Sequence, residues 1–394
     1  MACGSVALAA LRPIGRNVHM SAYQGSSHFI PWAQPAFWGR EEAYVLEALR
    51  STWISGGPFV ERLEKDMAAH IGCEHAVAVA NGTAALHLAY LALGLQPGDE
   101  IVVPGFGFMA AANIALHFGA RPVFCDVDPE TWCMRASDVI GVLTGKTRAV
   151  VAVHTYGNVC EMNDLLALAV ETGIPIIEDA AEAFSSRIDG RQAGSLGKIN
   201  TFSFHATKTI STGEGGLVAT DDDKTGEILR LYRSHGLRRQ RHYWHEVPGH
   251  NFRLTNLQAA LGCAQLECID RIISERQRVF VHYQRRLRSM PGIALQQFTG
   301  GCEPVVWTVA VRLSEDIYPQ GRDAVIAAMA TEGIETRPGF QAPAEMSYFE
   351  PASLPTSETL GRWVLSMPTY PTLADHEIER VCDRLAAHAH GKGR

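Results

Sequence analysis

Short apolar runs alternate with helical patterns through the first two thirds of the sequence, and this alternation constrains the fold more than any other feature. The runs have strand length, and the segments between them place apolar residues at helical spacing. The predicted strands are His75–Ala80, Ile101–Val103, Arg121–Asp126, Ala149–Val153 and Pro175–Glu178, and the predicted helices are Thr83–Leu93, Phe108–His117 and Asp164–Glu171. The runs are apolar on both faces, as expected of parallel strands covered by helices on both sides. The sequence therefore predicts an α/β fold, with a large α/β/α domain around a mostly parallel central sheet.

The pattern changes at about Asn256. The segment Leu257–Leu287 is long, helical and rich in charges, which is typical of a connector between domains. A predicted strand at Val305–Arg312 and predicted helices at Arg322–Glu332 and His376–His388 follow, and they indicate a smaller C-terminal α+β domain. We therefore divide the chain into a disordered leader at 1–29, a large cofactor-binding domain at 30–260, and a connector helix with the small domain at 261–394.

The composition argues against several classes of protein. The 394 residues carry a formal net charge of −7, and the basic run at Arg230–Arg241 is short, so no nucleic-acid partner is predicted. The nine cysteines are an odd number without CxxC spacing, which favours reduced thiols over disulfides or a metal site. The apolar stretch Val6–Leu11 is too short to span a membrane, and no later window supplies 18 uncharged apolar residues. These features predict a cytoplasmic protein that binds no metal, nucleic acid or membrane.

Two short polar segments follow predicted strands of the large domain. Asn81-Gly82-Thr83 lies between a strand and a helix, where a glycine lets backbone N–H groups approach an anion. Thr83 is also a good helix N-cap, and capping alone would account for it. Asp179 follows the apolar strand that ends in Glu178. Its carboxylate could accept a hydrogen bond from a cationic ring nitrogen, or it could cap a helix.

Lys208 lies between two apolar, strand-like runs, Thr201–Phe204 and Gly216–Thr220, next to the glycine-rich turn Thr212-Gly213-Glu214-Gly215-Gly216. A lysine there is either a charge at the edge of the sheet or an amine held for chemistry. Desolvation between strands would lower its pKa from the reference value of about 10.4 and make it a better nucleophile. Pyridoxal phosphate requires donors for its phosphate, a carboxylate for its ring nitrogen and a lysine for its aldehyde. The sequence therefore predicts pyridoxal phosphate as the cofactor.

Several motifs occur in the same order as in a known enzyme family: STWISGGPFVERLE, NGTAALHLA, VHTYGN, IEDAAEA, FSFHATK and TGEGG. From about Phe29 to Ala386 the sequence resembles the DegT/DnrJ/EryC1/StrS family of sugar aminotransferases, which are pyridoxal-phosphate enzymes of fold type I. The segments DVDPETWCM and YWHEVPGHNFRLTNLQAALGCAQLE look closest to those of the family's GDP-perosamine synthases. Those enzymes aminate C4 of GDP-4-keto-6-deoxymannose.

The resemblance implies a role for each matching residue. Lys208 would bond to the cofactor aldehyde and then carry the proton between the donor carbon and the cofactor, and Asp179 would pair with the ring nitrogen. The phosphate would be held by Gly82, Thr83 and Ser203, the ring would stack on Phe108, and Glu182 would lie on the face of the cofactor. Asn251 would reach the phosphate of a neighbouring subunit, so the family pattern implies a homodimer with shared active sites.

The implied function is transfer of an amino group from L-glutamate to the keto carbon of a nucleotide-linked 4-keto-6-deoxy sugar. Candidate substrate-binding residues are Trp53, Ser55, His245 and Arg337, and the Arg238–His245 loop is a further candidate for nucleotide phosphates. The chain departs from the family pattern at Phe184-Ser185, at Phe106-Gly107 and in GFQAPAEM after Pro338. These departures cluster where the substrate would lie, so the sequence leaves the sugar open.

Three alternatives remain. An aminotransferase for another keto-sugar nucleotide, or for a keto-cyclitol in antibiotic biosynthesis, would use the same cofactor residues. A sugar dehydratase of the same fold is less consistent with the sequence, because such relatives carry histidine where this chain has Lys208. A non-catalytic, cofactor-binding regulatory protein would not need the intact set of Lys208, Asp179, Ser203 and Asn251.

Overall fold

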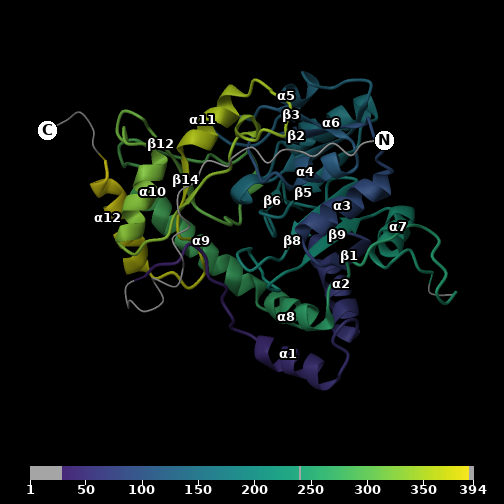
Figure 1. Ribbon diagram of the computed structural model, residues 1–394. Helices are drawn as coiled ribbons and strands as arrows, with labels where there is room; N and C mark the ends of the chain where they lie inside the picture. The colour runs from purple at the N-terminus through teal and green to yellow at the C-terminus, as the bar shows by residue number, and fades with distance from the viewer. Residues whose placement is uncertain (1–28, 239–240, 390–394) are drawn as a thin grey trace, which may run out of the picture.

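The computed structural model describes residues 29–238 and 241–389, and a seven-stranded sheet forms its centre (Figure 1). The strand order is β1 (His75–Val79), β9 (Gly216–Thr220), β8 (Ile199–Ser203), β5 (Ile176–Asp179), β4 (Thr147–Val153), β2 (Glu100–Pro104) and β3 (Arg121–Cys125). Only β9 runs antiparallel to its neighbours, so the predicted mostly parallel sheet is confirmed. The leader predicted at 1–29 lies, except for Phe29, outside the described residues.

Helices cover both faces of this sheet. Along β4, Val151 packs into the cluster that contains α3 (Gly82–Leu93) and α4 (Ala110–His117), whereas its neighbour Val150 packs against α6 (Met162–Thr172) on the other face. Successive side chains of a strand point to opposite faces, so burial on both sides explains why the strand sequences are apolar throughout. The short helix α5 (Ala136–Ile140) lies on the α6 side, and α7 (Asp223–Arg233) packs against α3.

The predicted helical stretch at Leu257–Leu287 is two helices. α8 (Asn256–Glu267) ends and α9 (Ile269–Leu287) begins at Cys268, whose φ and ψ are −100° and 11°. α8 packs against α1 (Glu41–Arg50) and α2 (Pro58–Ile71), while the apolar face of α9 packs into the core of the C-terminal part. The break lets two consecutive helices face two different cores.

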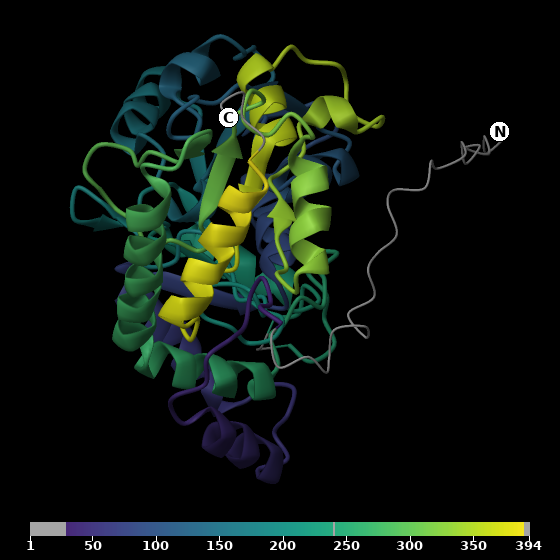
Figure 2. The ribbon, with the colours of Figure 1, turned by 90° about the vertical axis from the view of Figure 1, so that its left-hand side faces the viewer.

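The C-terminal part is built around a four-stranded antiparallel sheet in the order β10 (Ile293–Leu295), β12 (Ala310–Leu313), β14 (Val364–Ser366) and β13 (Arg337–Pro338). The helices α9, α10 (Arg322–Thr331) and α12 (Asp375–Ala387) cover it, and Figure 2 shows α12 (yellow) beside α9 (green). Ile30 bridges to Ile334, so the start of the described chain also joins this core.

Shorter elements complete the fold. They are β6 (Arg187–Ile188), β7 (Arg191–Gln192), β11 (Cys302–Glu303), α11 (Pro355–Trp363) and two 3-10 turns, η2 (Thr155–Gly157) and η3 (Pro343–Glu345). The predicted strand at Val305–Arg312 starts late, at Ala310, because the preceding residues bond elsewhere. Val305 N–H donates to the Ser186 hydroxyl, and Trp307 N–H donates to the carbonyl of Tyr156. This segment is thereby drawn to the end of the central sheet.

The described residues also carry three simpler findings. The eight cysteines among them are free thiols. Within 29–238 and 241–389, no helix is long and apolar enough to cross a membrane, and no group of three His, Cys, Asp or Glu side chains could hold a metal ion.

Candidate active site

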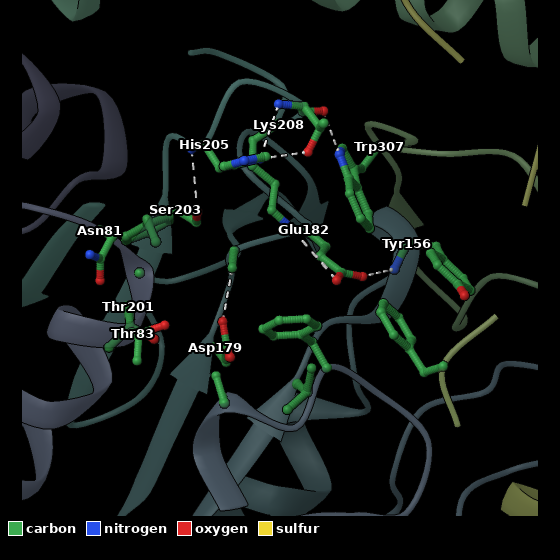
Figure 3. Close-up of a pocket in the computed structure, with 18 of the residues that line it drawn as sticks. Asn81, Thr83, Tyr156, Asp179, Glu182, Thr201, Ser203, His205, Lys208 and Trp307 are labelled. Atoms are coloured by element: carbon green, nitrogen blue, oxygen red, sulfur yellow. Dashed lines mark hydrogen bonds and ion pairs between the residues drawn. The ribbon is translucent and has the colours of Figure 1, made fainter. Parts of the chain in front are cut away.

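A pocket of about 410 Å³ opens at the carboxyl ends of β4, β5 and β8 (Figure 3). It brings together most of the residues singled out in the sequence: Gly82, Thr83, Phe108, Asp179, Glu182, Ser203, Lys208 and Arg337. Trp307, Arg337 and Phe340 reach it from the C-terminal part. The pocket therefore lies between the two sheets, at the sheet edge where α/β proteins bind their ligands.

Lys208 places its amino group inside the pocket. Its side chain is only 13% exposed, and its Nζ lies 3.6 Å from Glu182 Oε1 and 3.7 Å from the centre of the Trp307 ring. Burial lowers the pKa of Lys208 below its ordinary value, although the carboxylates of Glu182 and Asp179 oppose that shift. The structure thus answers the question that the sequence left open: Lys208 is a desolvated amine inside the pocket.

The glycine-rich turn shapes the loop that carries Lys208. Phe204 N–H donates to the carbonyl of Gly215, and Ala206 N–H donates to the carbonyl of Gly213, whose φ is +81°. That left-handed conformation favours glycine. At the far end of the loop, Arg276 Nη2 donates to the carbonyl of Lys208 at 3.2 Å.

The N-terminus of α3 faces the pocket. Asn81 is the N-cap, since its Oδ1 accepts the backbone N–H of Ala84 at 2.8 Å, so the capping role considered for Thr83 is wrong. The first N–H groups of a helix have no partner within the helix and favour an anion. A β-carbon added at Gly82 would lie 2.9 Å from the β-carbon of Ser203, which requires glycine at this close approach.

Asp179 and Glu178 are neighbours with different surroundings. Asp179 lines the pocket, and its Oδ1 accepts the N–H of Ala181 in a turn at 3.1 Å, not at the start of a helix. Burial raises the pKa of Asp179 above its ordinary value. A cationic partner in the pocket would favour the ionised carboxylate again.

Glu178 points to the other face of β5, and both oxygens of its carboxylate accept hydrogen bonds from the protein. Its oxygens accept the N–H groups of Gly194, Leu196 and Gly197 at 2.6 to 2.9 Å. His154 Nδ1 accepts the N–H of Cys160, so its Nε2 carries the proton and donates to Glu178 at 2.8 Å. Burial opposes ionisation of Glu178, but these bonds outweigh it and lower the pKa. Glu178 is therefore structural.

Glu182 connects Lys208 to the segment at the end of β4. Its Oε2 accepts the N–H of Tyr156 at 2.9 Å, while Oε1 faces the lysine. Burial raises the pKa of Glu182, although Lys208 opposes that shift. Burial therefore moves the two pKa values toward each other, and proton exchange between these side chains becomes easier.

Aromatic side chains form one wall of the pocket. Tyr156, at a φ of +60°, stacks on Phe340 with ring centres 5.1 Å apart, and Trp32 contacts Trp307 edge-on. The guanidinium of Arg337 lies 4.4 Å from the centre of the Trp32 ring and pairs with Glu335 at 2.8 Å. Sequence reasoning missed Trp32, Tyr156, Trp307 and Phe340 as site residues. Tyr156 lies in the quoted motif VHTYGN, whereas Trp307 sits in an apolar run with no local sign of its role.

The remaining predicted residues lie outside this pocket. Trp53 is 66% exposed, and Ser55 lines a second cavity, of about 470 Å³, together with Arg238 and Tyr243. His245 Nδ1 lies 2.7 Å from the carbonyl oxygen of His235, and Asn251 Oδ1 accepts from Arg253 Nε. Within one chain these four residues do not complete the site.

The residues of the pocket fit pyridoxal phosphate. The close approach of Gly82 to Ser203 leaves the α3 N-terminus and the Ser203 side chain side by side, as a phosphate requires. The buried carboxyl group of Asp179 suits the ring nitrogen, and the desolvated amine of Lys208 suits the aldehyde.

Comparisons with known proteins agree with this interpretation. Residues 38–386 match the model of the DegT/DnrJ/EryC1/StrS aminotransferase family. The chain is 40% identical over 359 residues to a GDP-perosamine synthase from Caulobacter vibrioides, covering 89% of this chain and 95% of that protein.

Two solved structures share the fold. An aminotransferase, TlmJ, from Streptoalloteichus hindustanus superposes with a TM-score of 0.85 at 32% identity, over 91% of this chain and 98% of that chain. DesI, solved in the presence of its TDP-sugar product, has the same TM-score and identity, over 93% of this chain and 95% of that chain. The predicted fold class is confirmed.

Proposed function

This chain belongs to the DegT/DnrJ/EryC1/StrS aminotransferase family, and from that premise we propose that it moves an amino group from L-glutamate to C4 of GDP-4-keto-6-deoxymannose. It is a sugar aminotransferase, and its cofactor is pyridoxal phosphate. The choice of GDP-linked sugar rests on the likeness to GDP-perosamine synthases.

The observation that carries the proposal is the position of Lys208. Its amine lies in a buried pocket between Glu182 and Trp307, and the pocket also contains Asp179 and the α3 N-terminus. A protein that only bound a ligand would have no use for a desolvated lysine beside a carboxylate that can exchange a proton with it.

The chain's own residues have distinct tasks in this reaction. When bound, pyridoxal phosphate supplies an aldehyde for primary amines and a ring that accepts electrons. Asp179 would hold a positive charge at the ring nitrogen, while the N-terminus of α3 and Ser203 would hold the phosphate. Nζ of Lys208 takes a proton from one carbon and returns it to another, and Glu182 sets the charge next to that nitrogen.

The substrate side of the pocket suits an anionic sugar that has lost a hydroxyl group. Arg337 offers a half-exposed guanidinium, held in place by Glu335 and by the face of Trp32, that can bind a carboxylate or a phosphate. The aromatic rings of Tyr156, Phe340 and Trp307 offer an apolar wall for the methyl group of a 6-deoxy sugar.

We further propose that the enzyme acts as a cytoplasmic homodimer in which each subunit completes the other's site. Exposed aromatic side chains, Trp53, Tyr243 and Trp244, flank or line the second cavity, which also contains Arg238 and Arg241. Large exposed apolar groups of this kind mark an interaction surface. If a second copy of the chain bound at this surface, the basic side chains and Asn251 of each subunit would reach the active-site pocket of the other subunit.

The test combines absorption spectra with product analysis. We expect the wild-type protein with pyridoxal phosphate to show a visible band that L-glutamate bleaches, and Lys208→Ala to lack that response. A panel of keto-sugar nucleotides and keto-cyclitols then identifies the acceptor, with GDP-4-keto-6-deoxymannose expected to give an amino sugar.

Each other outcome has a definite meaning. Amination of a different acceptor would correct the substrate but leave the aminotransferase in place. Loss of the sugar's 3-hydroxyl without amination would favour a dehydratase. A band that glutamate and other amino acids leave unchanged would favour a cofactor-binding protein without catalysis.

A further inference from the structure

Trp307 contacts the catalytic lysine loop in two ways. Nζ of Lys208 lies over the face of its indole, 3.7 Å from the ring centre, and its Nε1–H donates to the carbonyl of Thr207 at 2.7 Å (Figure 3). One buried side chain from the C-terminal part therefore fixes both the amine and the backbone just before it.

Trp307 is itself held firmly. Its N–H donates to the carbonyl of Tyr156 at 3.2 Å, and the Tyr156 ring stacks on the indole at 6.2 Å and 23°. The buried guanidinium of Arg276 donates both to the carbonyl of Trp307, at 2.9 Å, and to the carbonyl of Lys208, at 3.2 Å. Arg276 thus ties the two residues to the same point on α9.

The charged groups that act on the lysine amine come from several elements. Glu182 and Asp179 favour the ammonium form, and Arg276 disfavours it. The other titratable side chains lining the pocket are Tyr156, His205, Glu214 and Arg337. The indole face adds an attraction for a cation but offers no acceptor that could take its proton.

We propose that Trp307 is a positioning residue that holds the amino group of Lys208 against its ring as an ammonium ion, in the interval between taking up a proton and releasing it. In an aminotransferase the lysine is released from the cofactor in each cycle as a neutral amine. Its Nζ would take one proton from the carbon of the amino donor and later give that proton to a carbon of the cofactor, so it is an ammonium ion only between those two events. A free amine without a fixed place would lose its alignment between those two events. Trp307 supplies that place and keeps the proton on the nitrogen until it is needed. This inference rests on the proposed function, because only such a cycle uses the lysine in both states.

The test exploits the small number of lysines. The whole chain has only six, so reductive methylation with ¹³C-formaldehyde gives few NMR signals, and Lys208→Arg assigns the one from Lys208. Titration of the full-length, cofactor-free protein then reports the pKa of the methylated Lys208 amine, which is compared between variants labelled in the same way. We expect Trp307→Leu to lower the pKa of Lys208, because the ring that stabilises the ammonium ion is gone. Trp307→Phe keeps a weaker ring face and should give a smaller decrease.

A matched control separates this effect from the loss of any buried tryptophan. Trp132 belongs to the same aromatic cluster but does not line the pocket, so Trp132→Leu should leave the Lys208 titration unchanged. With cofactor bound, Trp307→Leu should move the acid limb of the pH profile for glutamate to lower pH and reduce kcat by about tenfold.

An unchanged or raised pKa for Lys208 in Trp307→Leu would overturn the proposal. Should that variant fail to fold, Trp307→Phe decides, since any decrease supports the role of the ring and no decrease contradicts it. Because the NMR titration needs no substrate, it stays informative if no keto-sugar nucleotide is aminated. The two proposals can therefore fail separately.

Discussion

A β-carbon added to Gly216 would lie 2.6 Å from both the carbonyl carbon and the carbonyl oxygen of Asn81. The last glycine of the turn after Lys208 therefore packs directly on the backbone that begins α3. The lysine loop and the anion-binding helix terminus are thus fixed against each other through a contact that only glycine allows.

Gly216→Ala should weaken cofactor binding. The added methyl group must displace the Asn81-Gly82 backbone, and overpacking of this kind costs about 1–3 kcal/mol. We expect the dissociation constant for pyridoxal phosphate to rise by about tenfold, measured by titration of the visible band. Gly145→Ala is the matched control, since nothing lies within 4 Å of its added β-carbon. Equal cofactor affinity in the two variants would contradict the packing argument.

Asp179→Asn should stabilise the cofactor-free protein while reducing activity. Burial raises the folded-state pKa of Asp179, so its contribution to stability is present below the unfolded pKa of about 3.9 and is lost as pH rises through the folded value. Asparagine stays neutral, so the variant's advantage should grow from pH 4 to pH 8 in urea unfolding.

The same substitution removes the charge expected at the ring nitrogen. With cofactor bound, kcat should fall by about 10²-fold or more, as for the loss of a major electrostatic contact. If Asp179→Asn were less stable than the wild type at pH 8, the interactions of the ionised Asp179 carboxylate would outweigh the cost of burying its charge, and the prediction would be wrong.

Glu182→Gln should shift the pH dependence of the reaction. Glutamine can still accept the N–H of Tyr156, but the negative charge 3.6 Å from Nζ of Lys208 is lost. An ammonium ion without its counter-charge has a lower pKa, so the acid limb of the kcat profile should move to lower pH. Glu214→Gln, at an exposed carboxylate of the same pocket, serves as the control and should leave the profile in place. A shift to higher pH in Glu182→Gln would rule out this charge effect.

Mixed dimers test the shared active site. If Asn251 serves the partner's pocket, a hybrid of Lys208→Ala and Asn251→Ala subunits contains one intact site and one doubly altered site. Random pairing should then restore about a quarter of the wild-type activity when cofactor is limiting. Lys208→Ala mixed with Asp179→Asn gives the control, since those two residues line the same pocket of one chain and no intact site can form. Failure of the first mixture to recover activity would place Asn251 in its own subunit's site or outside both.

The sequence by itself determined the central sheet and the chemistry of three groups. Runs that are apolar on both faces predict buried parallel strands, and the structure has a strand at each run that precedes Asn256. Lys208, Asp179 and the Asn81-Gly82-Thr83 turn were recognisable because each lies next to a strand or helix terminus and because the three together match the chemical needs of one cofactor. Successive side chains of a strand point to opposite faces of the sheet. The neighbours Glu178 and Asp179 therefore face opposite sides, with Asp179 in the pocket and Glu178 in a structural role.

Only the tertiary structure decided which side chains surround the lysine. Trp307 and Arg276 lie far from Lys208 in the sequence, and both sit in segments that look like ordinary core or connector helix. The helical stretch broken at Cys268 and the late start of β12 have the same origin, because each segment follows contacts with a distant partner instead of its local pattern. Local periodicity records which face of an element is buried, but it does not record what that face meets. The geometry around Nζ therefore had to come from the fold.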